Sequence, residues 1–132
     1  MPQKPLPQDR GLKFLRLKKV VTLAQLVVHL HCSPRTVQRR LAELEALHSY
    51  NQNGRYYTLR DIPKFDANGL WRYQGAFFSR FGNLPQTFVQ LVQRAPAGLT
   101  AAEVGQLLGL RPSSFLWAFR DYHYSDRSHF VQ

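Results

Sequence analysis

The chain has few of the residues from which disulfide-bonded, metal-binding or membrane-spanning proteins are built. Its 132 residues include a single cysteine, Cys32, so neither an internal disulfide nor a zinc site of four cysteines is available. No apolar run approaches the roughly 18 residues that span a bilayer, and the polar start MPQKPLPQDR lacks the apolar stretch of a signal peptide. We therefore expect a soluble, cytoplasmic protein with no membrane partner.

Acidic residues are also scarce, with 8 Asp and Glu against 18 Lys and Arg. The acids are scattered, and no two of them form the paired carboxylates of a general acid and base. The 5 histidines show no metal-ligand spacing. The sequence contains neither a nucleophile with an oriented base nor a glycine loop for phosphate. It therefore predicts a protein that is not an enzyme and that uses no cofactor and no metal.

The positive charge is concentrated in one half of the chain. Residues 1–64 hold twelve Lys and Arg and four Asp and Glu, a net charge of +8, whereas residues 65–132 hold six and four, a net charge of +2. A strongly basic half attracts a polyanion over long distances, before any specific contact forms. The charge pattern thus favours a nucleic-acid partner for the first half.

One segment of the sequence occurs twice. Residues 22–41 recur 78 positions later as residues 100–119, with the same kind of residue at the positions that define a helix-turn-helix. The matched pairs are Thr22 and Thr100, Ala24 and Ala102, Leu26 and Val104, Leu30 and Leu108, Pro34 and Pro112, Thr36 and Ser114, Val37 and Phe115, and Leu41 and Phe119. Such a repeat predicts two copies of one supersecondary unit.

The first copy carries the sequence signals of two capped helices. Thr22 is placed to cap a helix over residues 23–31, which we expect to end in a tight turn at Cys32. Ser33 and Pro34 then predict the start of a second helix that reaches about Leu47. The helical period turns Val37, Leu41 and Leu44 inward. The opposite face is formed by Arg35, Gln38, Arg39 and Ala42.

A hairpin is predicted directly after these helices. Asn53 and Gly54 lie between segments rich in aromatic and β-branched residues, which is the strongest short-range hairpin signal. With a helix over residues 11–19 and a short strand at residues 20–21, the order of elements resembles a winged helix-turn-helix domain over about residues 10–62. SPRTVQRRLAEL resembles the start of a recognition helix in bacterial transcription regulators of that type. The chain departs from the family pattern at Leu47-His48-Ser49, where many such domains have a glycine before the hairpin, called the wing.

The resemblance implies a fold that is mainly α with small β wings, of the α+β class, and a partner that is double-stranded DNA. Base contacts in the major groove are expected from Arg35, Gln38 and Arg39. Contacts to the DNA backbone are expected from Lys13, Arg16, Lys18, Lys19, Ser33, Thr36, Arg40 and Arg55. For Arg40, an ion pair with Glu43 or Glu45 stays open. Lys4 and Arg10 are expected on an arm that reaches the DNA.

The remaining segments complete a tandem arrangement. We expect a flexible arm at residues 1–9, a DNA-binding domain at residues 10–62, an aromatic connector at residues 63–83 and a second winged-helix-like domain at residues 84–132. The connector is expected to be ordered, since flexible linkers rarely contain so many aromatic residues. In the second domain we expect helices over residues 85–94, 100–108 and 112–121, and a second wing that turns at Ser125 and Asp126.

The second copy differs from the first on its outward face. Ser113, Leu116, Trp117 and Arg120 occupy the positions of Arg35, Gln38, Arg39 and Ala42. Aromatic anchors concentrate at protein contacts, so Leu116, Trp117 and Arg120 predict a protein interface, with a second copy of the chain or another protein. Equally open is the packing of Trp117 on the connector aromatics of its own chain.

The sequence thus predicts a sequence-specific protein for double-stranded DNA, associated with the nucleoid. It favours a transcription regulator or the DNA-binding subunit of a mobile element or defence system, without choosing between them. Two alternatives stay open. Winged helices also serve as protein-interaction scaffolds, since fold alone does not define function. The basic domain also suits RNA, with the connector aromatics stacked on unpaired bases.

Overall fold

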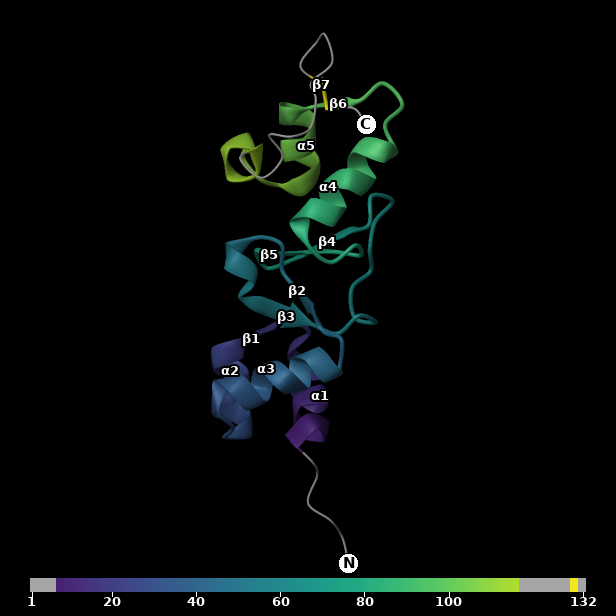
Figure 1. Cartoon of the computed structure of the whole chain (residues 1–132). Helices are drawn as coiled ribbons and strands as arrows, with labels where there is room; N and C mark the ends of the chain where they lie inside the picture. The colour runs from purple at the N-terminus through teal and green to yellow at the C-terminus, as the bar shows by residue number, and fades with distance from the viewer. Residues whose placement is uncertain (1–6, 117–128, 131–132) are drawn as a thin grey trace, which may run out of the picture. The chain divides into compact units, whose positions relative to one another are not determined.

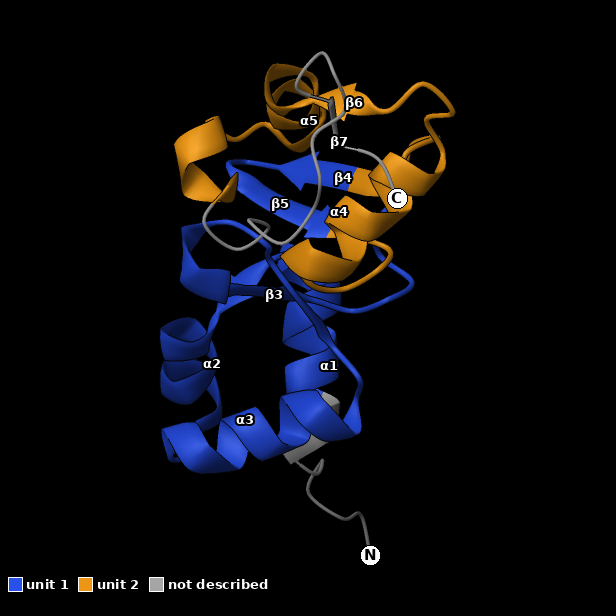
Figure 2. Cartoon of the chain, turned by 45° about the horizontal axis from the view of Figure 1, so that its top comes forward, with its two compact units in different colours: residues 1–64, 71–78 blue, residues 65–70, 79–132 orange. Residues whose placement is uncertain are grey.

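The structure, a computed structural model, describes residues 7–116 and 129–130 (Figure 1). The chain divides into two compact units (Figure 2), one formed by residues 1–64 and 71–78 and the other by residues 65–70 and 79–132. Both contain α-helices and small sheets, so the protein belongs to the α+β class. No helix in the described ranges has the length and apolar character needed to cross a membrane.

Helices and a small sheet form the body of the first unit. Its elements are α1 (Pro7–Lys18), β1 (Val21–Thr22), α2 (Leu23–Leu30), α3 (Pro34–Glu43), β2 (Leu47–His48), the 3-10 turn η1 (Gln52–Gly54) and β3 (Tyr56–Thr58). Strand β3 is central in the antiparallel order β1-β3-β2, with Val21 opposite Tyr57 and Leu47 opposite Thr58. The three helices gather on one side of this sheet (Figures 1 and 2).

Helix α1 begins earlier than the sequence predicted. The arm was expected to reach residue 9, but the helix starts at Pro7, and residues 1–6 of the expected arm lie outside the described residues. Proline suits the first position of a helix because its φ angle is already helical and its missing N–H has no partner there. Arg10 consequently lies within α1, where its guanidinium donates to the carbonyl of Leu30 over 3.3 Å. It therefore binds the C-terminal end of α2 and does not belong to an arm.

The predicted caps of α2 and α3 are confirmed. The Thr22 hydroxyl accepts a hydrogen bond from the Gln25 N–H at 3.1 Å, and the Gln25 side chain accepts one from the Thr22 N–H at 2.8 Å. The Ser33 hydroxyl accepts from the Thr36 N–H at 3.2 Å. Between the helices, His31 adopts a left-handed conformation with φ of 55°. These local bonds define the two helix starts independently of the rest of the fold.

The end of α3 corrects the prediction that this helix reaches Leu47. The helix ends at Glu43, and Glu45 adopts a left-handed conformation with φ of 52°. The Ala46 N–H donates to the Leu41 carbonyl and the Glu45 N–H to the Ala42 carbonyl, both at 3.0 Å. These two bonds form a Schellman motif, which satisfies carbonyls at the helix end. The chain then turns into β2, where Leu47 is 4% exposed.

Replacing Glu45 by glycine is expected to stabilise the first unit by about 0.5 to 1 kcal/mol. A left-handed conformation costs a residue with a Cβ atom roughly 1 kcal/mol or more, and glycine adopts it freely. Urea unfolding monitored by circular dichroism measures the change. As a control, Ala42→Gly, at an exposed position inside the helix, is expected to destabilise by about 1 kcal/mol. Destabilisation by both variants would contradict the assigned left-handed helix end.

The core of the first unit contains the side chains that the helical pattern turned inward. Buried members come from α1, α2, α3 and the sheet, namely Leu15, Val21, Leu26, Leu30, Val37, Leu41 and Leu59. Leu23, Val27 and Leu44 pack against this cluster and are partly buried. The core therefore defines which face of each helix points to solvent.

Strands β2 and β3 form the predicted hairpin, but its connection is longer than expected. Asn53 and Gly54 have positive φ angles of 57° and 67°, as in a two-residue turn. The strands nevertheless stop at His48 and Tyr56, and residues 49–55 form a loop that includes η1. The loop is longer because it makes a tertiary contact. The Tyr50 N–H, near the start of this loop, donates to the carbonyl of Phe77 at 2.8 Å and thus bonds outside the hairpin.

The segment expected as an aromatic connector contains a second hairpin. Strands β4 (Leu70–Tyr73) and β5 (Ala76–Ser79) pair with each other across Gln74 and Gly75, whose φ angles are 48° and 84°. Residues 71–78 of this segment belong to the first unit, and residues 65–70 and 79–83 belong to the second. The aromatic segment is therefore ordered, as predicted, and is part of both units.

The second unit repeats part of the first. It contains α4 (Leu84–Gln93), β6 (Leu99–Thr100), α5 (Ala101–Leu108), the 3-10 turn η2 (Pro112–Ser114) and β7 (His129–Phe130). Thr100 and Glu103 form a capping box like that of Thr22 and Gln25. Strand β6 pairs with β7, just as β1 pairs with β3. The strand and capped helix that begin the repeated segment are therefore alike in both units.

The repeat is less complete after α5. An α-helix was predicted from Pro112, but the described residues form the 3-10 turn η2, followed by Phe115 with φ of −134°. Arg111 stands where the first copy has Ser33, and it makes no side-chain cap. The missing cap gives a physical reason for the weaker helix start. Residues 117–128, which include the predicted turn of the second wing, lie outside the described residues.

Candidate nucleic-acid interface

The outward face of α3 is the first component of the candidate site. Arg35, Gln38 and Arg39 are exposed, whereas Val37 and Leu41 of the same helix are only 1% and 5% exposed. Within the described part of the chain, none of the three polar side chains forms a hydrogen bond or an ion pair. Their polar groups are therefore available to a ligand.

The N-terminus of α3 adds two hydroxyl groups. The Ser33 hydroxyl donates to the Thr36 hydroxyl at 2.9 Å while it caps the helix. Both residues were expected to contact the DNA backbone, and in the structure they first define where the helix begins. The free N–H groups and partial positive charge of this helix end suit a phosphate.

A hollow lies beside the outward face, between α3 and the β2–β3 hairpin. Its lining consists of Gln38, Leu41, Ala42, Ala46, His48 and Tyr57. His48 and Tyr57 were not expected at the site. The signal that points to them is the short strand pair, which places them opposite each other in the register of β2 and β3. The hollow thus joins the α3 face to the neighbouring hairpin.

Arg40 differs from its neighbour Arg39. Its guanidinium lies 3.8 Å from the Glu43 carboxylate, and its side chain is 24% exposed. This is the ion pair that the sequence left open as the alternative to a phosphate contact. Arg40 also lines a narrow cavity with the core residues Leu15 and Leu26, so it lies at the edge of the core.

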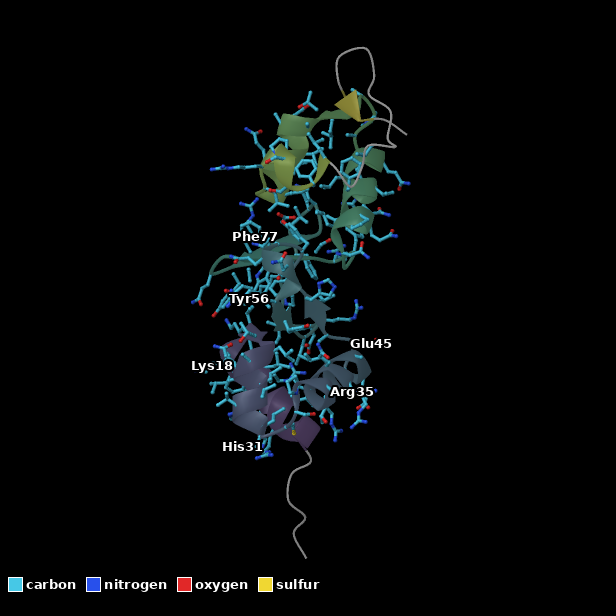
Figure 3. All side chains as sticks on the ribbon, turned by 60° about the vertical axis from the view of Figure 1, so that its left-hand side comes forward. Lys18, His31, Arg35, Glu45, Tyr56 and Phe77 are labelled. Atoms are coloured by element: carbon cyan, nitrogen blue, oxygen red, sulfur yellow. The ribbon has the colours of Figure 1, made fainter. Side chains whose placement is uncertain are left out.

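The basic residues of α1 and its C-terminal end are exposed, as the helical pattern predicted. They are Lys13, Arg16, Lys18 and Lys19. Arg16 forms an ion pair with Asp61 at 3.0 Å, in which both side chains are more than half exposed. Lys18 and Arg35 lie on opposite sides of the first unit in Figure 3. The structure therefore does not bring Lys18 and Arg35 onto one side of the unit.

The charge of this region has one sign. Residues 10–42 contain no Asp or Glu. They contain eight basic side chains, namely Arg10, Lys13, Arg16, Lys18, Lys19, Arg35, Arg39 and Arg40. Arg16 and Arg40 pair with Asp61 and Glu43, and the fields of the other six add to one another and attract anions.

The outer residues of the β2–β3 loop and of the second unit were also expected at interfaces. Arg55 is exposed, and its guanidinium carbon lies 5.2 Å from the centre of the Tyr56 ring. In the second unit Ser113 is exposed and Leu116 is half-buried. Trp117 and Arg120 lie outside the described residues, so the predicted protein interface stays a prediction.

Within residues 7–116 and 129–130, no three His, Cys, Asp or Glu side chains come together as potential metal ligands. Comparisons of the chain with protein-family models, curated proteins and solved structures found no match.

Proposed function

We propose that the first unit is a winged helix-turn-helix domain that binds double-stranded DNA in a sequence-specific manner. The outward face of α3 is the observation that carries this proposal. It combines two arginines and a glutamine on a capped helix whose opposite face is buried. A helix of this width fits the major groove of B-form DNA. In this proposal α2 and α3 form the helix-turn-helix and the β2–β3 hairpin is the wing.

The side chains of α3 match the donor and acceptor pattern of base edges. An arginine donates two hydrogen bonds to O6 and N7 of guanine, and a glutamine pairs with N6 and N7 of adenine. Each such pair contributes about 1 to 3 kcal/mol of discrimination between bases. Arg35, Gln38 and Arg39 therefore supply specificity, while the acid-free charge of residues 10–42 supplies affinity for phosphates.

The second unit has a different role in this proposal. It repeats the capped helix and the strand pair, which supports a tandem winged-helix arrangement. However, η2 takes the place of a capped helix, and the half-buried Leu116 stands where the first copy has Gln38. We assign this unit to contacts with a second copy or another protein. Such a division of labour suits a nucleoid-associated transcription regulator, or a DNA-binding subunit of a mobile element or defence system.

The test begins with the selection of a preferred duplex from a random library. Arg35→Ala and Arg39→Ala are each expected to weaken binding to that duplex by about 1 to 3 kcal/mol and to affect random duplex less. Fluorescence anisotropy on both duplexes measures the difference. Arg60→Ala is the control, since Arg60 is exposed in the same unit but lies outside α3. Equal losses on preferred and random duplex would contradict base reading by α3, and an absence of duplex binding would favour the protein-scaffold alternative.

A further inference from the structure

The loop of the β2–β3 hairpin is bonded to the β4–β5 hairpin within the first unit. The side-chain amide of Asn51 donates to the Gly75 carbonyl at 2.9 Å and accepts from the Phe77 N–H at 3.0 Å. The Tyr50 N–H adds a bond to the Phe77 carbonyl at 2.8 Å. The loop and the second hairpin are therefore held as one element, and the side chains on them have defined positions before any ligand binds.

This combined element pairs cations with aromatic rings. The guanidinium carbon of Arg72 lies 4.9 Å from the Phe77 ring centre, and that of Arg55 lies 5.2 Å from the Tyr56 ring centre. Lys19 Nζ lies 5.9 Å from the ring of Tyr73. All three cations are exposed and all three rings are half-buried. Each cation is thus held against a ring that keeps part of its surface in solvent.

The rings of two of these pairs lie away from Arg35 of α3. In Figure 3, Lys18, Tyr56 and Phe77 follow one side of the first unit, and Arg35 lies on the other side. We call the residues of this side the aromatic-cation strip. Its members are Lys18, Tyr56 and Phe77, together with Arg55 and Arg72, whose guanidinium groups lie against the rings of Tyr56 and Phe77. Tyr73 follows Arg72 in β4 and points to the opposite face of the strand, so Tyr73 and its partner Lys19 are not members. The strip is therefore a second surface, away from the α3 face that is proposed to read the bases of duplex DNA.

The strip is also free of negative charge along the chain. Residues 46–60 and 67–102, which include all of β2, β3, β4 and β5, contain no Asp or Glu. The nearest acids in sequence are Glu45, Asp61 and Asp66. A phosphate chain that follows these strands would meet cations without meeting a carboxylate on the same elements.

We propose that the aromatic-cation strip binds single-stranded nucleic acid. Rings and guanidinium planes recognise the faces of bases, and cations recognise the phosphates between them. In a duplex the base faces are stacked on one another and are not accessible, so rings on a surface gain little from it. Unpaired nucleotides offer both the face and the phosphate. This ligand differs from that of α3, and the inference does not depend on sequence-specific reading by α3.

The proposed chemistry is shared by unpaired DNA and unpaired RNA. The experiment therefore titrates the full chain with labelled oligo-dT and oligo-U of about 12 nucleotides, a length on the scale of single-strand sites in other folds. The double variant Arg55→Gln and Arg72→Gln removes two exposed charges and leaves the rings in place. We expect it to weaken binding to one or both strands about tenfold, and to reduce the salt slope by about 0.7 for each phosphate that is no longer neutralised.

A second variant tests the rings without changing charge. Tyr56→Leu keeps an apolar side chain and removes the flat face, and we expect at least a fivefold loss from the stacking of one base. The matched control for the two arginine substitutions is Arg80→Gln, because Arg80 is an exposed arginine whose guanidinium carbon lies 5.6 Å from the centre of the Phe65 ring in the second unit. It is expected to leave single-strand affinity unchanged.

The outcomes distinguish binding by the strip from binding by the α3 face. Arg39→Ala is expected to weaken duplex binding and to spare single-strand binding, and Tyr56→Leu is expected to do the reverse. The absence of binding to both oligo-dT and oligo-U would overturn the inference. So would strip variants that bind single strands as tightly as the parent chain. Neither result would affect the proposal for α3.

Discussion

Replacement of Phe88 by alanine is expected to destabilise the second unit by about 3 to 5 kcal/mol. The Phe88 side chain is fully buried in α4, and its ring lies 6.5 Å from that of Phe115, which is also fully buried. Truncation removes most of the packing between them and leaves a cavity. A unit of this size is only marginally stable, so a change of this magnitude should unfold much of it.

The same variant tests the proposed division of labour. Backbone amide spectra should lose the dispersed signals of α4 and α5 and keep those of α2 and α3, because the core of the first unit contains none of the second unit's residues. Duplex affinity per chain should then stay close to that of the parent. Gln86→Ala, an exposed position in α4, is the control. Disappearance of the α3 signals together with those of α4 would show that the two units fold as one.

The second large effect is expected from salt. If five phosphates are neutralised, log affinity for duplex DNA should fall with log salt at a slope of about −4.5, which is roughly a 500-fold weakening between about 50 and 200 mM. The cations of residues 10–42 other than Lys18, without an acid among them, are the reason to expect so strong a dependence. Anisotropy titrations at several salt concentrations give the slope.

Single substitutions show which residues contribute to the salt dependence of duplex binding. Neutralising Lys13 is expected to reduce the duplex slope by about 0.9 if that side chain contacts a phosphate. Arg16 already pairs with Asp61, so it has to leave this ion pair before it can contact a phosphate. Lys18, which we place on the aromatic-cation strip, should change the single-strand slope instead. A duplex slope near zero for the parent chain would contradict electrostatic binding of DNA altogether.

Local features of the first unit followed from neighbouring residues. The caps at Thr22 and Ser33 join groups only three positions apart, so the sequence contains both partners of each bond. The outward face of α3 followed from the helical period, because burial of Val37 and Leu41 defines which side chains face solvent. The two positive φ angles at Asn53 and Gly54 agree with the turn signal.

Failures of the sequence prediction have two physical causes. Some local signals were misjudged, since Pro7 starts a helix in a segment expected as an arm, and Arg111 gives η2 no side-chain cap. Other features depend on residues that the sequence keeps far apart. The α2 carbonyl that Arg10 binds lies 20 positions away, and the groups that bind Asn51 lie 24 and 26 positions away.

The order of residues along the chain was enough to predict the concentration of basic residues in the first half, the starts of α2, α3 and α5, and the exposure of Arg35, Gln38 and Arg39. Each of these depends on composition, on helical period or on bonds within one helical turn. The folded arrangement was needed to show that Arg10 bonds to the end of α2, that the loop after β2 bonds to β5, and that Lys18 lies across the unit from Arg35. Those outcomes require distant segments to meet, and which segments meet is decided by the packing of the whole unit around its core, not by any residue's neighbours in the chain.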